Sequence, residues 1–145
     1  MAITSAICNS FKQELLVGTH DFTATTGDTF KLALFTSSAT LGAGTTAFAT
    51  TNEITNSSGT AYTSGGVSLT SVTPSLDSST AIATFTNASF TNASFTANGC
   101  LIYNSDKSNK AVAVVAFGAD KTVTSGTFTI QFPTADATNA IIRLA

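Results

Sequence analysis

Alternation of apolar and polar residues with a period of two is the feature of this sequence that most restricts its fold. The segment "GTFTIQFP" covers residues 126–133. Its Phe128, Ile130 and Phe132 share one face of an extended chain, and the Thr and Gln residues between them share the other. The segment "TFKLALFTSS" (29–38) alternates in the same way. Because successive side chains of a strand point to opposite faces, both segments are predicted to be β-strands.

Further strands are predicted at regular intervals, with turn-forming residues between them. The link "SDKSN" between two of them predicts a hairpin. Short strands at this spacing predict an all-β fold, an antiparallel β-sandwich of the jelly-roll or immunoglobulin-like type, with residues 1–145 as a single domain. The remaining predicted strands are 67–76, which ends near Pro74, and 80–86, 99–104, 110–118 and 139–145.

One short N-terminal helix is predicted over residues 3–17. Thr4 or Ser5 would cap its start, and Gly18 would supply the left-handed residue that ends it. A helix that is apolar on one side must pack against a core. The apolar residues that recur at helical spacing are Ile3, Ile7, Phe11 and Leu15.

The stretch "FTNASFTNASFTANG" (85–99) nearly repeats every five residues and allows three interpretations. A pentapeptide solenoid would have only about one coil, with no neighbour to bury its face. The two Asn-Ala-Ser sequences match the glycosylation sequon, but they are expected by chance in a chain rich in Asn, Ser and Thr. The third interpretation is a break between two strands.

The third interpretation is favoured because a spacing of five sends successive Phe residues of one continuous strand to opposite faces. A break between the strands removes this conflict. It predicts that Phe85 and Phe95 lie in the core and that Phe90 lies in a turn or at a contact surface.

Residues 37–66 are rich in Gly, Ser, Thr and Asn and are predicted to form a long surface loop. Loops of this length in a compact domain usually bind a partner or are locally disordered. The residues predicted to make contacts from this loop are Phe48, Glu53 and Tyr62. For the two aromatic residues, the alternative is that their rings pin the loop to the sheet.

The sequence offers few groups for catalysis, so the chain is predicted not to be an enzyme and to bind no cofactor or metal. His20 is the only histidine, and the adjacent Asp21 would point away from it on an extended chain. One histidine and two distant cysteines cannot form a zinc site. Cys8 and Cys100 are predicted to be small, buried apolar residues without a disulfide.

The composition excludes two classes of partner. Charged residues make up 10% of the chain and the net charge is −2, so the basic surface of a nucleic-acid-binding protein is missing. The same charge argues against binding to anionic membranes. The start "MAITSAICNSFKQELLVG" lacks the features of a secretory signal, so synthesis in a cytosol is expected. Few charges with abundant Thr and Phe favour a protein that packs into an assembly.

Five stretches, in this order, resemble a family of small virion structural proteins from tailed bacteriophages. They cover nearly the whole chain and are "AICNSFKQELLVGTHDF", "DTFKLALFTSSATLG", "AYTSGG", "GCLIYNSDKSNKAVAVVAFGADKT" and "FTIQFPTADATNAIIRLA". The resemblance implies assembly in the host cytoplasm and action in many copies within the virion. It carries no catalytic residues over to this chain.

The leading hypothesis is a capsid decoration, or cement, protein that clamps and stabilises the head shell. Its partner would be the major capsid protein, and it would act as a homo-oligomer, with a trimer at local three-fold axes as the candidate. The capsid contacts would lie on the 37–66 loop and on the N-terminal segment. The alternatives are a tail or head-fibre component, such as an adaptor for host attachment, and a carbohydrate-binding module that uses Phe48 and Tyr62.

Overall fold

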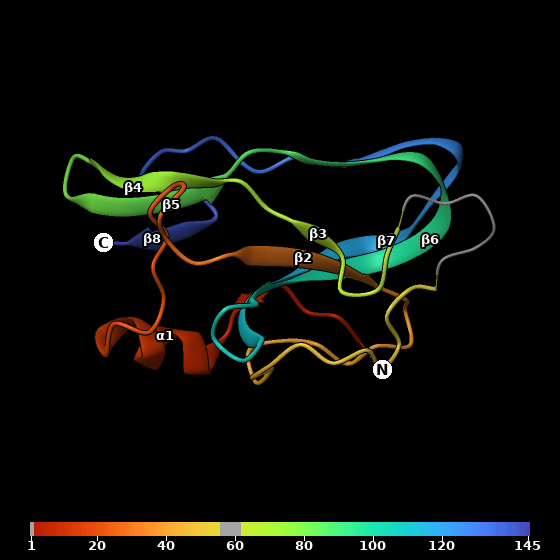
Figure 1. The fold of residues 1–145 in the computed structure, drawn as a ribbon, viewed down its shortest axis with the longest axis horizontal. Helices are drawn as coiled ribbons and strands as arrows, with labels where there is room; N and C mark the ends of the chain where they lie inside the picture. Colours follow the sequence, from red (N-terminus) through yellow and green to blue (C-terminus); the bar gives the residue numbers. More distant parts are fainter. Residues whose placement is uncertain (1, 56–61) are drawn as a thin grey trace.

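The structure, a computed structural model, describes residues 2–55 and 62–145 and has two antiparallel sheets with one short helix (Figure 1). Strands hold 49% of the residues and helix 6%, so the predicted all-β, sandwich-like fold with one N-terminal helix is confirmed. The strand order is β1-β7-β6-β2-β3 in one sheet and β4-β5-β8 in the other. The elements are β1 (Ala6–Ile7), α1 (Asn9–Leu16), β2 (Phe30–Phe35), β3 (Val67–Ser68), β4 (Ser71–Asp77), β5 (Thr80–Phe85), β6 (Ala88–Asn104), β7 (Lys110–Ile130) and β8 (Ile142–Leu144).

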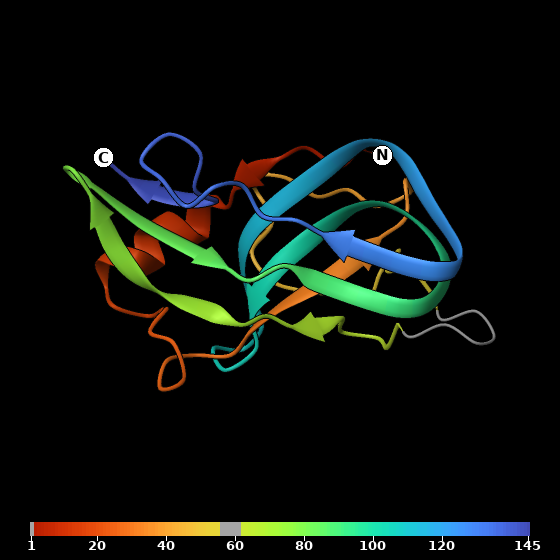
Figure 2. The ribbon, with the colours of Figure 1, turned by 90° about the horizontal axis from the view of Figure 1, so that it is seen from above.

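The long hairpin of β6 and β7 forms the centre of the fold. The two strands contain 17 and 21 residues and pair with each other along most of their length. Figures 1 and 2 show that they bend together at the end of the molecule away from β4 and β5. The hairpin thus contributes to both layers. The predicted strands 110–118 and 126–133 are parts of one continuous strand, β7, which ends at Ile130 rather than at 133. The predicted hairpin link lies between β6 and β7.

A β-bulge in β6 explains how the near-repeat of residues 85–99 fits into a strand. Between the pairs Phe90↔Phe128 and Ala93↔Gly126, β6 has two residues where β7 has one. The extra position includes Asn92, whose φ of 51° is left-handed. A bulge shifts the alternation by one residue, so Phe90 and Phe95 face the same side despite their spacing of five.

The prediction that Phe90 lies in a turn or at a contact surface is therefore wrong. Phe90 is 4% exposed within β6, and its ring lies 5.6 Å from that of Tyr62 and 5.9 Å from that of Phe95. The predicted strand break after Phe85 exists, but the next strand, β6, already begins at Ala88 and contains both Phe90 and Phe95. Phe85 and Phe95 are buried, as predicted.

The predicted helix over 3–17 begins too early. α1 starts at Asn9, while β1 pairs with β7 and Ile3 forms a bridge with Leu41. The apolar residues before Asn9 are therefore used at the edge of a sheet, where backbone hydrogen bonds to other segments outweigh the helical pattern. Neither predicted cap acts as one, because the N-cap is Cys8, which makes no side-chain hydrogen bond there. Gly18 ends the helix with a φ of 74°, as predicted.

The predicted strand 67–76 is divided into β3 and β4, and it does not end near Pro74. Pro74 lies inside β4, where the register with β5 shifts between Val72 and Ser75. β4 is an edge strand of its sheet, and a proline is tolerated at an edge or a bulge because it has no N–H to donate.

The left-handed backbone conformation of Asn92 in the bulge can be tested by substitution. Asn92→Val should lower the free energy of unfolding by about 1–3 kcal/mol, because a β-branched residue is strained at positive φ. Asn92→Gly should change it by less than about 1 kcal/mol, because glycine accepts this conformation. Urea denaturation followed by circular dichroism measures both. Equal effects of the two substitutions would contradict the role assigned to the bulge.

Candidate functional site

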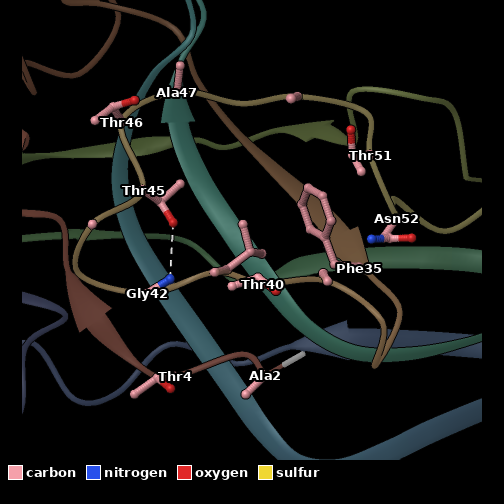
Figure 3. Close-up of a pocket in the computed structure, with 14 residues that line it drawn as sticks. Ala2, Thr4, Phe35, Thr40, Gly42, Thr45, Thr46, Ala47, Thr51 and Asn52 are labelled. Carbon is pink, nitrogen blue, oxygen red and sulfur yellow. Dashed lines mark hydrogen bonds between the residues drawn. The ribbon is translucent and has the colours of Figure 1, made fainter.

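A surface hollow lies between the N-terminal segment and the long loop (Figure 3). Its volume is about 910 Å³, and none of its lining residues is charged. The ring of Phe35, from β2, lies between the two arms of the loop. The lining residues are Ala2, Thr4, Phe35, Ala39, Thr40, Leu41, Gly42, Gly44, Thr45, Thr46, Ala47, Ala49, Thr51 and Asn52.

Backbone hydrogen bonds hold the two walls of this hollow together. Thr4 N–H donates to the carbonyl of Leu41 at 2.9 Å, and Leu41 N–H donates to the carbonyl of Ala2 at 3.1 Å. A tight turn between Gly42 and Thr45 shapes the loop, because Gly42 N–H donates to Thr45 Oγ1 at 3.0 Å. The hollow is thus built by the chain itself, from segments that are far apart in the sequence.

The chemistry of the hollow suits a neutral partner surface. Threonine hydroxyls and an asparagine amide offer hydrogen bonds, and alanine and threonine methyl groups offer apolar contact. A surface without charges imposes only a small desolvation cost when a partner covers it. It provides neither a nucleophile paired with a base nor a set of metal ligands.

The interaction residues predicted on the loop do not line this hollow. Tyr62 is fully buried and Glu53 is 8% exposed. Tyr62 Oη donates to Glu53 Oε1 at 2.6 Å and accepts from Leu34 N–H at 3.0 Å. Phe48 is half-buried, and its ring stacks on that of Tyr103 with centroids 4.5 Å apart. These residues pin the loop to the sheet, which was the alternative for the two aromatic rings.

The Glu53 carboxylate is the centre of this loop anchor. Besides Tyr62, it accepts hydrogen bonds from Gly65 N–H at 2.6 Å and from Ser64 Oγ at 2.8 Å. Burial raises the pKa of Tyr62, and the nearby carboxylate adds to this rise. Burial also raises the pKa of Tyr103 to about 12, again with a contribution from Glu53. Both phenols therefore stay protonated and keep donating hydrogen bonds.

His20 is buried in a second polar network, and its carboxylate partner is Glu14 rather than the adjacent Asp21. His20 Nε2 lies 2.7 Å from Glu14 Oε2. The Asn104 amide donates to Asp28 at 2.8 Å, and its Nδ2 lies 3.0 Å from His20 Nδ1. Nδ1 therefore accepts from Asn104, and Nε2–H donates to Glu14. This network ties α1 and the 20–28 segment to the end of β6.

The structure also describes the two cysteines and the side chains that could bind a metal ion. Cys8 and Cys100 are both buried and free, as predicted. Burial raises the pKa of the Cys8 thiol to about 11 and that of Cys100 to about 12, so neither forms a reactive thiolate at neutral pH. Within residues 2–55 and 62–145, no group of three or more His, Cys, Asp or Glu side chains could hold a metal ion.

Comparisons with protein-family models, with curated proteins and with solved structures find no match to this chain. The resemblance to bacteriophage virion proteins therefore stays a prediction. Over the described part of the chain, no helix is long and apolar enough to cross a membrane.

Sequence reasoning found the two segments that form the hollow but missed its individual residues. The Gly, Ser, Thr and Asn content of residues 37–66 predicted a loop, but nothing in it indicated that the loop would fold back against Ala2 and Thr4. The contact between His20 and Asn104 was missed because these residues are 84 positions apart. The contact between His20 and Glu14 was missed because it depends on how the chain after α1 folds back on the helix.

The Glu14 network predicts acid sensitivity. Burial raises the pKa of Glu14, but hydrogen bonds from His20 and Lys110 outweigh it and hold that pKa below its usual value. A lowered carboxyl pKa stabilises the fold above the unfolded-state value of about 4 and loses this effect as the pH falls through the folded-state value. Glu14→Gln should lower the free energy of unfolding by about 1–3 kcal/mol at pH 7.

The measurement is urea denaturation at several pH values between neutral and about pH 3. Glu14→Gln should flatten the loss of stability on the acid side. Asp120→Asn changes an exposed carboxylate on β7 and should leave the pH profile as it is. An unchanged profile for Glu14→Gln would exclude the proposed role of the network.

The close packing of the chain after the loop anchor against β2 can be tested at Gly66. Its φ is 80°, and a Cβ there would overlap the carbonyl oxygen of Leu32. Gly66→Ala should therefore cost more than about 2 kcal/mol of unfolding free energy. Gly44→Ala is the matched control, because a Cβ at Gly44 meets nothing within 4 Å, and it should change stability by less than about 0.5 kcal/mol. Thermal denaturation of both variants would reveal whether this difference exists.

Proposed function

We propose that this chain is a structural protein of a bacteriophage virion and acts as a capsid decoration, or cement, protein. The observation that carries the proposal is the uncharged hollow, because it is built by the N-terminal segment and the long loop. These are the two segments for which the sequence predicts capsid contacts. The family resemblance along the chain supports the same role.

The physical mechanism is the repeated burial of neutral surface. Each copy would cover a neutral edge or loop of the major capsid protein with its methyl groups and satisfy polar groups with its hydroxyls. Anything that binds only the assembled shell stabilises that shell by mass action, and modest contacts add up over many copies. The two buried anchors, at Glu53 and at Glu14, would keep the contact surface in a fixed shape.

The alternative role as a carbohydrate-binding module loses the aromatic candidates on which it depended. A sugar-binding surface needs exposed rings, whereas Tyr62 is fully buried and Phe48 stacks on Tyr103. The alternative as a tail or head-fibre component uses the same kind of protein contact, so copy number in the particle has to decide between the two.

A substitution in the hollow tests the proposal. Ala49 lines the hollow and is exposed, so Ala49→Arg should leave the fold intact and place a charge in the contact. Binding to purified capsid shells should weaken at least about tenfold, equal to about 1.4 kcal/mol. Thr91→Arg, on the exposed side of β6 outside the hollow, is the control and should bind as the parent chain does.

Co-sedimentation with shells measures this binding, and quantitative mass spectrometry of purified virions measures copy number. A copy number comparable to that of the major capsid protein supports decoration. A number near that of tail proteins supports the tail alternative. Absence from the virion would refute both roles.

A further inference from the structure

The core-facing side of the three-stranded sheet is left uncovered at one end. On β5, Ala81, Ala83 and Phe85 alternate on one face, and Phe85 belongs to the hydrophobic core. Ala81 pairs with Leu76 on one side and with Leu144 on the other, so these three residues form a row on the same face. Leu76 is 73% exposed and Leu144 is 58% exposed, although their face is the one that packs inward elsewhere.

An apolar hollow of about 130 Å³ opens beside this row, between α1 and the sheet. We call it the apolar mouth. It is about the size that accommodates one large apolar side chain or a small aromatic molecule. All its lining residues are apolar, and they include Leu15, Phe22, Pro74, Ala83, Ile142 and Leu144.

The end of α1 presents two protruding apolar side chains next to the apolar mouth. Leu16 is 88% exposed and Val17 is 68% exposed, and they directly follow Leu15, which lines the mouth. Gly18 ends the helix after them with a φ of 74°, so they stand on a defined turn. Figure 1 shows α1 and β8 at the same end of the molecule. Exposed apolar side chains gathered at one place on a soluble protein usually mark a contact.

We propose that the occupant of the apolar mouth is a second copy of this chain, related by a two-fold axis. Leu16 of each copy enters the mouth of the other, and the pair of chains covers the row of Leu76, Ala81 and Leu144. A two-fold contact requires one patch that carries both the protruding part and the matching hollow, and this patch does. An unrelated partner would require either the protruding side chains or the hollow, but not both.

The charges of the chain do not oppose this contact. None of the residues of the mouth, the row or the protruding pair is ionisable. The net charge of each chain is −2, so two copies repel each other only weakly. This contact uses a different surface from the hollow under the long loop, so it stands whether or not that hollow binds a capsid.

Analytical ultracentrifugation of the full chain over a series of concentrations tests the proposal. The expected result is a reversible equilibrium between the 14.7 kDa chain and a species of twice that mass. Leu16→Asp and Leu76→Asp should each raise the dissociation constant at least about tenfold. Because both side chains are largely exposed, the urea midpoint of the monomer should not fall.

Val72→Asp is the matched control, because Val72 lies on the same strand and is 43% exposed. Its partner on β5 is Thr84, so it faces the opposite side of the sheet from Leu76. This variant should dimerise like the parent chain. A further test mixes Leu16→Asp chains with Leu144→Lys chains. Leu144 lines the mouth that Leu16 enters, so a mixed dimer restores one contact as an ion pair and keeps the other as it was.

Recovery of the dimer in this mixture supports the two-fold contact. A chain that stays monomeric at all concentrations, a trimer, or a dimer that tolerates Leu16→Asp and Leu76→Asp would each overturn the proposal. Loss of the dimer in Val72→Asp would overturn it as well, because the contact would then lie on the other face.

Discussion

The structure depends on one constraint: the β6–β7 hairpin must keep the same face inward while it bends through both layers. Phe90 and Phe95 on β6 and Phe128 on β7 meet on that face, with ring centroids 5.0 to 6.5 Å apart. A regular pair of strands would turn alternate rings outward. The bulge at Asn92 corrects the phase, and Ser125, at a φ of 46°, lies at the compensating shift on β7.

Two buried carboxylates hold the long loop and α1 in place, which lie outside the hydrogen-bonded sheets. Glu53 gathers Tyr62, Ser64 and Gly65 into one anchor for the long loop. Glu14 performs a similar task for α1 through His20 and Lys110. A buried carboxylate is stable only with such donors, and once paired it holds its segments in one arrangement.

Charged side chains are absent from both the hollow and the apolar mouth. Several of its few ionisable side chains are used inside or at the margins of the polar networks, as with Lys107 against Asp28 and Lys110 against Glu14. The hollow and the mouth carry none. Such surfaces favour association by burial and shape, with little long-range attraction or repulsion. The absence of charge on these two surfaces supports the proposed structural role.

The sequence alone determined the fold class, most strand positions, the hairpin before Lys110, the end of the helix at Gly18 and the burial of both cysteines. Alternation, turn residues and apolar content are local properties, so they can be read along the chain. Only the tertiary structure decided that Phe90 is buried, that the helix starts at Asn9 and that His20 pairs with Glu14 and Asn104. These features depend on bulges, edge pairing and hydrogen bonds between distant segments, and no local pattern encodes which distant atoms will meet.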